Sequence, residues 1–330
     1  MYLLPRPQEM LLQDNVFYVD YTAEICIDPE ASPEWLHYAS LLQKEIEQDT
    51  GFHLNINRNL PVFQTPSILL KSTSGHSQQE YTLRIRESGI LLTASSNSGM
   101  LYAIQTLRQI IRQEGACLPG LDIHDFPVIS NRGLYYDVTR GRIPTLSYLK
   151  KMADTLSFYK INQLHLYIEH TYMFRNLSEV WRDDTPLTSS DILELDRYCA
   201  DLGIELVPSI ASFGHLYKIL RTKSFRHLCE REDLCEEPFG FIDRMEHHTI
   251  DVSNEESFSF IWSLIEEYLP LFRSDKFNIC GDETFDLGTG KSHELAEREG
   301  TQQLYIQYIK KLCDALVTHG KTPMFWGDIV

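Results

Sequence analysis

The feature that most constrains the fold of this chain is a change of rhythm at Arg132. Beyond that residue, short apolar runs typical of strands alternate with longer runs that place apolar residues at helical spacing. The strand-like runs are residues 133–138, 163–168, 204–210, 276–280 and 323–326, and the helix-like runs are residues 145–159, 190–202, 253–269 and 302–317. Such alternation predicts parallel strands joined by crossover helices.

Charged and polar side chains gather directly after these strand-like runs, among them Asp137, Glu169, His215 and the pair Asp282-Glu283. A (β/α) barrel builds its site from the loops at the carboxyl ends of its strands, although an open doubly wound sheet follows a similar rule. We expect an α/β fold of the (β/α)8 TIM barrel type. Because an eight-stranded barrel needs further strands, we expect the barrel to be truncated after the fifth strand.

The first part of the chain lacks this alternation and predicts a small α+β domain. Helices are expected at residues 33–48 and 98–113, strands at 52–56 and 67–70, and a hairpin at 81–86 and 90–93. Residues 115–131 carry two glycines and two prolines and are interpreted as a linker. We therefore expect an α+β domain over residues 1–125 and a barrel domain over residues 126–330, with the C-terminal part of the barrel missing.

The net charge of -17 argues against nucleic acid or an anionic membrane surface as the main partner. The seven cysteines are odd in number and form no C-x-x-C pair, which excludes an all-disulfide framework and favours a reducing, cytoplasmic location. The N-terminus does not have the pattern of a signal peptide, and no apolar run is long enough to span a bilayer. A homo-oligomer is compatible with the sequence.

An apolar run ends in Gly281 and is followed by two adjacent acids, Asp282 and Glu283. Neighbours in a regular strand point to opposite faces, so both acids serve one site only if the strand loses its regularity, which Gly281 permits. Two close carboxylates repel each other, so that one stays protonated to a higher pH than the other. A neutral acid beside an ionised one is the arrangement that glycoside cleavage needs, but the same pair also fits a solvated turn.

Several motifs in the same order resemble glycoside hydrolase family 20, the β-N-acetylhexosaminidases, over nearly the whole chain. They are Tyr81-Thr82-Leu83 with Gly89-Ile90, Asp125-Phe126-Pro127 with Arg132-Gly133-Leu134, Asp137-Val138-Thr139-Arg140, Phe213-Gly214-His215, Gly281-Asp282-Glu283, and Phe325-Trp326-Gly327-Asp328. The resemblance implies an exo-acting, retaining glycosidase that removes a terminal β-linked N-acetylglucosamine or N-acetylgalactosamine. It also implies that residues 1–125 are non-catalytic.

The resemblance implies a substrate-assisted mechanism, in which the 2-acetamido oxygen of the sugar attacks and an oxazolinium intermediate forms. Glu283 would be the general acid, and Asp282 would orient the acetamido group and stabilise the positive charge. Five further residues are the candidate substrate-binding residues: Arg132, Glu169, His215, Trp326 and Asp328. No cofactor and no metal site is expected.

The sequence departs from the family pattern at two positions. Glu169-His170 stands where many members have two aspartates, and Ala211 stands where many have an aspartate four residues before the histidine. Divergent, often intracellular branches show similar changes. Two alternatives remain open: a catalytically inactive sugar-binding homologue, and a metal-dependent barrel hydrolase, for which the adjacent His247-His248 would be poorly spaced.

Overall fold

The computed structural model describes residues 1–59, 66–240, 242–243 and 247–327. The chain divides into two compact units. The first unit contains Met1–Arg132, Asp154–Asn162 and Asp201–Ile204, and the second contains Gly133–Ala153, Gln163–Ala200 and Glu205–Val330. The first unit's main segment ends at the residue where the sequence changes rhythm, while the domain boundary between residues 125 and 126 stays a prediction.

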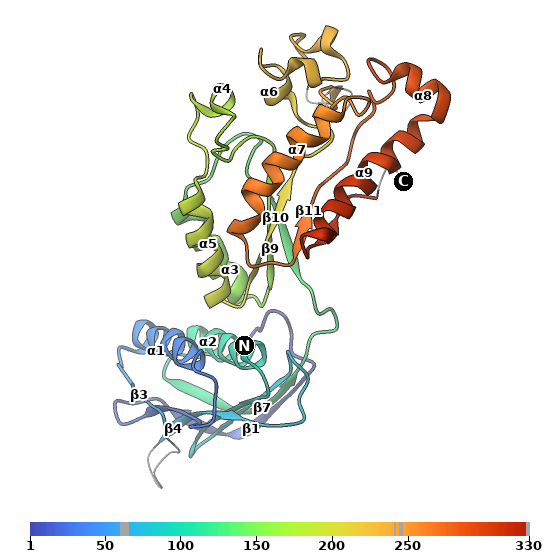
Figure 1. Cartoon of the computed structure of the whole chain (residues 1–330). Helices are drawn as coiled ribbons and strands as arrows, with labels where there is room; N and C mark the ends of the chain where they lie inside the picture. The colour runs from blue at the N-terminus through green and yellow to red at the C-terminus, as the bar shows by residue number, and fades with distance from the viewer. Residues whose placement is uncertain (60–65, 241, 244–246, 328–330) are drawn as a thin grey trace. The chain divides into compact units, whose positions relative to one another are not determined.

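The first unit is built on a seven-stranded mixed sheet (Figure 1). Its strands, in sheet order, are β1 (Glu9–Tyr18), β7 (Cys117–Asp125), β5 (Tyr81–Arg86), β6 (Gly89–Ala94), β4 (Ser67–Ser72), β2 (Glu24–Ile27) and β3 (Asn55–Asn57). The first four pair antiparallel, and β6, β4, β2 and β3 pair parallel. This arrangement agrees with the α+β organisation expected from the sequence.

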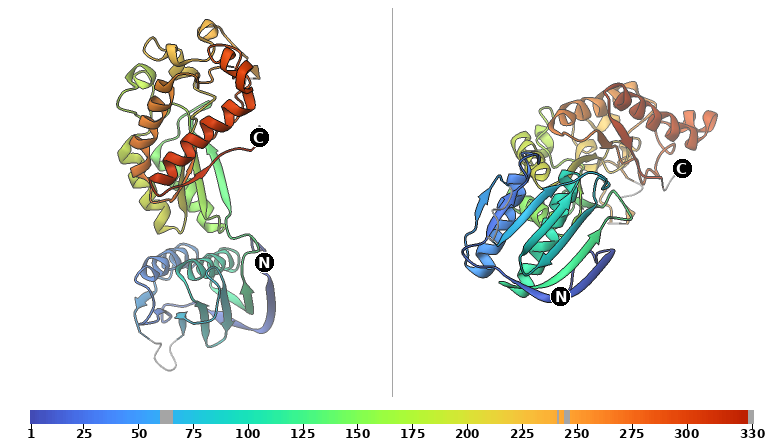
Figure 2. Two further views of the ribbon diagram at one scale, coloured as in Figure 1. Left: turned by 45° about the vertical axis from the view of Figure 1, so that its right-hand side comes forward. Right: turned by 90° about the horizontal axis from the view of Figure 1, so that it is seen from below.

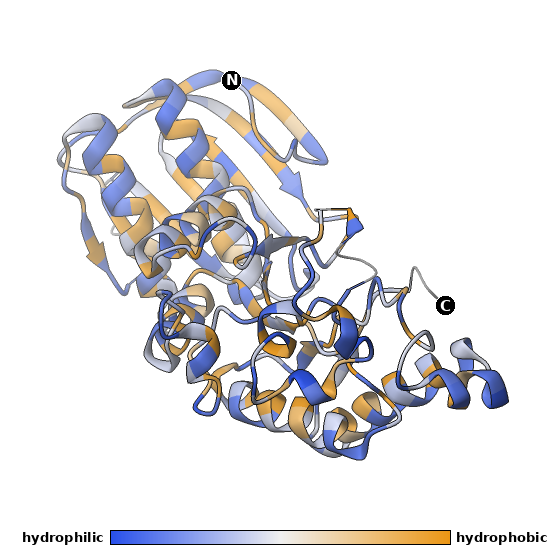
Figure 3. Cartoon of the chain, turned by 90° about the horizontal axis from the view of Figure 1, so that it is seen from above, coloured by the Kyte–Doolittle hydropathy of each residue, from blue (hydrophilic) through white to orange (hydrophobic). Residues whose placement is uncertain are grey.

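Helices α1 (Trp35–Thr50) and α2 (Asn97–Glu114) lie along one face of this sheet (Figures 1 and 2). Along each helix, hydrophobic residues alternate with hydrophilic ones, as Figure 3 shows. The apolar side chains of both helices pack with those of the sheet into one core, in which Trp35, Ile104 and Leu107 are buried. The N-cap of helix α2 is Ser96, whose hydroxyl accepts a hydrogen bond from the Gly99 N–H at 3.0 Å.

The prediction of a linker over residues 115–131 is wrong, because most of it is strand β7, which lies between β1 and β5. Pro119 and Gly120 suggested a turn, but Pro119 pairs with Val16 next to an irregularity of β1, where a proline is tolerated. Gly120 lies so close to the side chain of Asn15 that a Cβ atom at this position would collide with it. The two residues therefore serve a close strand contact instead of a turn.

The second unit contains a five-stranded parallel sheet. Its strands, in sheet order, are β12 (Thr322–Met324), β11 (Lys276–Asn278), β10 (Glu205–Ile210), β9 (Gln163–Ile168) and β8 (Gly133–Asp137). Sheet order is thus the reverse of chain order, and every neighbouring pair is parallel. This confirms the predicted succession of parallel strands, whereas closure into a full barrel stays a prediction.

The strands of the second unit are connected through helices, visible around β9, β10 and β11 in Figure 1. The helices are α3 (Leu146–Phe158), α4 (Ser178–Trp181), α5 (Ser189–Asp201), α6 (Tyr217–Leu220), α7 (Glu255–Tyr268), α8 (His293–Glu299) and α9 (Thr301–Thr318), with 3-10 turns at Arg226–Leu228, Glu232–Leu234 and Leu269–Leu271. No described helix combines the length and apolar character needed to cross a membrane.

Helix α7 shows how the sequence sets an element's start. Its N-cap is Asn254, whose side-chain oxygen accepts a hydrogen bond from the Glu256 N–H at 2.9 Å. The predicted helical run began at Ser253, two residues before the first helical residue, but the Ser253 hydroxyl donates to Asp251 at 2.6 Å instead. Asp251 thus fixes the turn that leads the chain into the helix.

Candidate active site

The carboxyl ends of strands β8, β9, β10 and β11 bring the predicted polar residues to one edge of the parallel sheet. Asp137 ends β8 and Glu169 directly follows β9. His215 follows β10 by five residues, and Asp282 and Glu283 follow β11 by four and five. Because parallel strands end at the same edge, residues up to 146 positions apart in the chain meet there.

The turn after β11 is what allows two adjacent acids to serve one site. Cys280, Gly281 and Glu283 have φ values of 59°, 84° and 50°, so the strand geometry is lost over this stretch. Asn278 stabilises the turn, because its side-chain oxygen accepts a hydrogen bond from the Cys280 N–H at 2.8 Å. A Cβ atom at Gly281 would lie 2.7 Å from Ile309 of helix α9, so a larger residue would displace the turn.

A second glycine lets His215 approach the acidic pair. A Cβ atom at Gly214 would lie 2.9 Å from the backbone oxygen of Asp282 and 3.2 Å from that of Glu283. The backbones after β10 and β11 are therefore in close contact. The Ser212 hydroxyl adds a hydrogen bond to the Ile279 carbonyl at 2.6 Å.

The imidazole of His215 lies between the two carboxylates. Its Nε2 atom is 3.3 Å from Asp282 Oδ2 and 3.2 Å from Glu283 Oε2. The His215 side chain is only 4% exposed, against 22% and 24% for the two acids. Burial acts to raise the pKa of Asp282, but the interaction with the His215 side chain outweighs it and the pKa is lowered. Asp282 is therefore held as a carboxylate.

Glu169 lies in a second polar group at the ends of β8 and β9. Its Oε1 accepts a hydrogen bond from the Tyr167 hydroxyl at 2.9 Å and lies 3.7 Å from the Arg140 guanidinium. Arg140 also pairs with Asp137 at 2.7 Å. Burial raises the pKa of Glu169, and Tyr167, His215 and Arg140 oppose the rise only in part.

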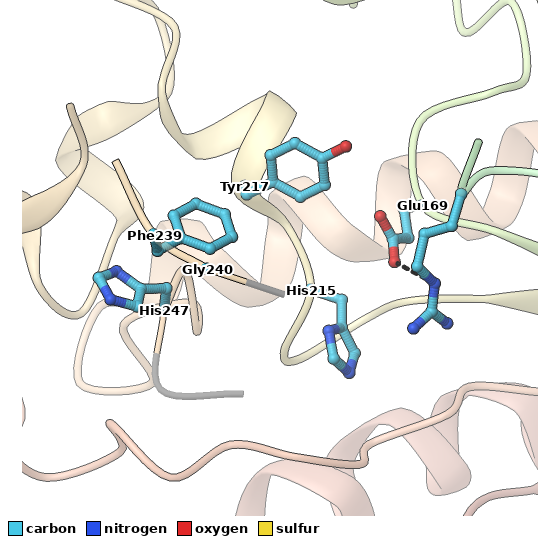
Figure 4. A pocket seen from close by; sticks show the side chains of 7 residues that line it. Glu169, His215, Tyr217, Phe239, Gly240 and His247 are labelled. Carbon is cyan, nitrogen blue, oxygen red and sulfur yellow. Dashed lines mark ion pairs between the residues drawn. The ribbon is translucent and has the colours of Figure 1, made fainter. Parts of the chain in front are cut away.

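A cavity of about 210 Å³ lies beside these groups, and Figure 4 shows the side chains that line it. Its lining residues are Arg140, Glu169, His215, Tyr217, Phe239, Gly240 and His247. The rings of Phe239 and His247 stack with centroids 4.9 Å apart, and Tyr217 meets Phe239 edge-on at 5.9 Å. The cavity thus joins a charged end at Glu169 to an aromatic wall.

Sequence reasoning did not single out Tyr217, Phe239 and His247 as members of the site. They come from the segment between β10 and α7, which has no regular periodicity from which a common face could be predicted. The position of Tyr217, two residues after His215, was the one available signal.

Trp326 lies near the acidic pair but does not line the cavity. Its backbone N–H donates to the Cys280 carbonyl at 2.9 Å, and its ring meets Tyr135 edge-on at 5.0 Å. The Tyr135 hydroxyl in turn lies 2.8 Å from the Ser209 hydroxyl. Trp326 is 39% exposed, so part of its ring remains accessible to a ligand.

Arg132 belongs to the first unit, where its guanidinium donates to Gln79, to the Tyr102 hydroxyl and to the backbone carbonyls of residues 129, 130 and 160. It lines a different cavity, together with Lys160 and Asp125. Its predicted role in binding sugar hydroxyls stays a prediction. Asp328, the remaining candidate, lies outside the described residues.

Two buried carboxylates fix the loop that follows the acidic pair. Asp286 accepts hydrogen bonds from the Thr249 N–H at 3.2 Å and from its hydroxyl. Glu230 accepts from the Gly290 N–H at 2.9 Å and from the Ser292 hydroxyl at 2.8 Å. These bonds tie residues 286–292 to positions 230 and 249, which lie on either side of Phe239 and His247 in the chain.

Comparison with known sequences identifies both parts of the chain. The sequence model described as "Glycosyl hydrolase family 20, catalytic domain" matches residues 130–330, and that described as "Glycosyl hydrolase family 20, domain 2" matches residues 1–126. Among curated relatives, a β-hexosaminidase of Porphyromonas gingivalis is 24% identical over 99% of this chain and 45% of its own length. The human β-hexosaminidase subunit beta is 23% identical over 77% of this chain and 48% of its own length.

Solved structures show the same fold. A chitobiase of Flavobacterium johnsoniae superposes with a TM-score of 0.83 and 22% identity, over 99% of this chain and 52% of that one. An exo β-N-acetylglucosaminidase of Vibrio harveyi, solved with N-acetylglucosamine, gives 0.81 and 22%, over 99% and 56%. The chain therefore spans about half the length of these proteins. These matches give no support to an inactive sugar-binding homologue or a metal-dependent hydrolase.

Proposed function

Because this chain belongs to glycoside hydrolase family 20, we propose that it carries the catalytic pair of a β-N-acetylhexosaminidase. The reaction would be hydrolysis of a terminal β-linked N-acetylglucosamine or N-acetylgalactosamine from a glycan. The single observation that carries this proposal is the group formed by Asp282, Glu283 and the buried His215 at the carboxyl end of β11.

Glu283 is assigned the role of general acid. It would protonate the glycosidic oxygen as the leaving group departs and later take a proton from the attacking water. Its side chain is about one-quarter exposed, so a substrate oxygen can reach it. The His215 Nε2 atom lies 3.2 Å from Glu283 Oε2.

Asp282 is assigned the role of an orienting and charge-stabilising group. Because its pKa is lowered, it is ionised when a positive charge develops on the sugar. A fixed carboxylate beside a developing cation lowers the barrier by electrostatic stabilisation. Asp282 immediately precedes Glu283 in the chain, so the two acids approach the sugar from nearly the same side.

The nucleophile is therefore assigned to the substrate. A protein nucleophile of a retaining glycosidase must attack from the face of the ring opposite to the acid, and adjacent residues of one turn are poorly placed for that. The 2-acetamido oxygen of the sugar can attack instead and form a cyclic oxazolinium. Holding this oxygen next to the reacting carbon replaces an encounter between two molecules by an intramolecular step.

We further propose that the five parallel strands are the first part of a (β/α)8 barrel, with a catalytic domain from residue 126 and a non-catalytic domain over residues 1–125. A cytoplasmic location belongs to the same proposal. It is supported by the seven cysteines, none of which forms a disulfide and most of which are buried.

The test compares two aryl β-glycosides that differ only at carbon 2, one with an acetamido group and one with a hydroxyl. We expect the hydroxyl compound to react very slowly, because it lacks the attacking oxygen and not merely a binding contact. A thiazoline mimic of the cyclic intermediate should bind more tightly than the substrate. Equal rates for the two glycosides, or a covalent ester trapped on any Asp or Glu, would overturn the mechanism.

A further inference from the structure

The His215, Asp282 and Glu283 side chains also have the composition and the spacing of a set of metal ligands. They offer three potential ligand atoms, one each, all within 4.8 Å of one another. Although His215 Nε2 lies 3.3 Å and 3.2 Å from the two carboxylates, it meets neither with the geometry of a hydrogen bond. His215 is 5% exposed, so a buried nitrogen without a hydrogen bond points into an acidic pair.

The separations match those of a zinc coordination shell. Nitrogen and carboxylate oxygen bind Zn²⁺ at about 2.0–2.2 Å, so neighbouring ligand atoms of a tetrahedral site lie about 3.3–3.5 Å apart. The distances from His215 Nε2 to Glu283 Oε2 and to Asp282 Oδ2, 3.2 Å and 3.3 Å, already have nearly that length. The distance between the ligand oxygens of the two carboxylates is at most 4.8 Å, and it shortens when either carboxylate rotates toward the other.

The chemistry of the donors agrees with the distances. Imidazole nitrogen and carboxylate oxygen are both zinc ligands, and three protein ligands leave the fourth position of a tetrahedral site for water. Two carboxylates also balance the double positive charge of the ion, which makes the partly buried site favourable for it. Unlike exposed acidic clusters, this group is held in place before any ion arrives. The close backbone approach at Gly214 and the turn at Gly281 fix the ligands relative to one another.

We propose that His215, Asp282 and Glu283 form a Zn²⁺-binding site, and that Zn²⁺ bound there excludes the sugar and inhibits the enzyme. The inhibition by Zn²⁺, unlike the binding of Zn²⁺, rests on the proposed function. A Glu283 carboxylate bound to Zn²⁺ cannot carry the proton that the leaving group needs. Asp282 bound to the same ion can no longer accept the acetamido N–H. Metal and substrate thus compete for the same two carboxylates.

Zinc binding is measured on the purified protein by competition with a chromophoric chelator, after exposed thiols such as Cys117 have been alkylated. We expect Glu283→Gln, which keeps the shape of the side chain, and His215→Gln each to weaken the strongest site by at least about tenfold. The matched control is His227→Gln. His227 also pairs with a glutamate, Glu256, at 3.0 Å, but at the surface, so its replacement should leave that affinity unchanged.

The competition half is tested by adding N-acetylglucosamine, which should raise the apparent dissociation constant for Zn²⁺ in proportion to its concentration. Zinc affinity that is the same in the native protein, Glu283→Gln and His215→Gln would overturn the site. Zinc bound at the site without any effect of the sugar would overturn the competition. Because the chelator assay needs no turnover, tight zinc binding in a protein without glycosidase activity would reject the proposed function and leave the metal site intact.

Discussion

Each unit of the molecule buries a group of charged side chains, and the two groups differ in how completely they are paired. In the first unit, Lys160 is 5% exposed and donates to the Asp125 carboxylate at 3.0 Å and to the Tyr81 hydroxyl at 2.8 Å. The Tyr81 hydroxyl also bonds Asp125 at 2.8 Å and lies 2.6 Å from Thr106. Burial lowers the pKa of Lys160 in spite of its partner. Every polar group of this cluster has a partner.

In the second unit, the buried charges at the strand ends are only partly paired. His215 Nε2, Asp282 Oδ1 and Glu169 Oε2 are buried and make no hydrogen bond. An unpaired buried polar atom costs about 1–3 kcal/mol, so a group with three of them reduces the stability of the fold. The comparison teaches that burial of charge alone does not identify a site. A buried charged group that has unused hydrogen-bonding atoms does identify a candidate site, because a ligand can bond to those atoms.

The largest effect is expected from Glu283→Gln, which tests the partly paired group. Loss of the proton donor should reduce turnover of a glycoside with a poor leaving group by about 10³–10⁴-fold, while unfolding stability changes little. Glu294→Gln on the surface of α8 is the matched control and should keep full activity. Near-normal hydrolysis by the Glu283 variant would show that the incompletely paired group is not the site of the chemistry.

An intermediate effect is expected from Lys160→Met, which tests the fully paired group. Removing one partner of a buried ion pair should cost about 3 kcal/mol of the free energy of unfolding, measured by urea denaturation. The folded variant should retain its turnover number. Lys44→Met, at an exposed position of α1, should change stability by less than about 0.5 kcal/mol. If the Lys160 variant lost more activity than its fraction of unfolded protein explains, the fully paired group would also take part in the chemistry.

The smallest effect is expected from Glu169→Gln, and it depends on pH. The pKa of Glu169 is raised by burial, so the folded state holds this proton more tightly than the unfolded state. Its contribution to stability is therefore complete below the ordinary glutamate pKa and is lost as the pH rises through the raised value.

The Glu169→Gln variant cannot lose a proton, so its melting temperature should equal that of the native protein at pH 4 and exceed it at pH 7. We expect a gain of roughly 1 kcal/mol. The exposed Glu237→Gln serves as the control and should show no such pH dependence. A variant less stable than the native protein at pH 7 would mean that Arg140 and Tyr167 already pair this carboxylate fully.

The sequence predicted those parts of the fold in which burial alone decides the structure. Strand β9 has the predicted bounds, because all of its residues are buried and apolar residues dominate it. Strand β11 ends two residues earlier than predicted, at Asn278, because the Asn278 side chain bonds the Cys280 N–H and the backbone then turns. That bond involves a side chain and a backbone group whose meeting no periodicity reveals.

The same limit applies to the site. His215, Asp282 and Glu283 were predicted from motifs at strand ends, and the structure brings them together. The aromatic wall of Phe239 and His247 could not be predicted, because an irregular segment presents it. Their position depends on tertiary bonds such as Thr249 to Asp286, between residues 37 positions apart.

The absence of a side chain at Gly214 also determines how closely the loop that carries His215 approaches the loop that carries the acids. A Cβ atom at position 214 would collide with the backbone oxygens of Asp282 and Glu283, so any larger residue would push the two loops apart. The distance between His215 and the two acids is therefore set by the contact between these two loops.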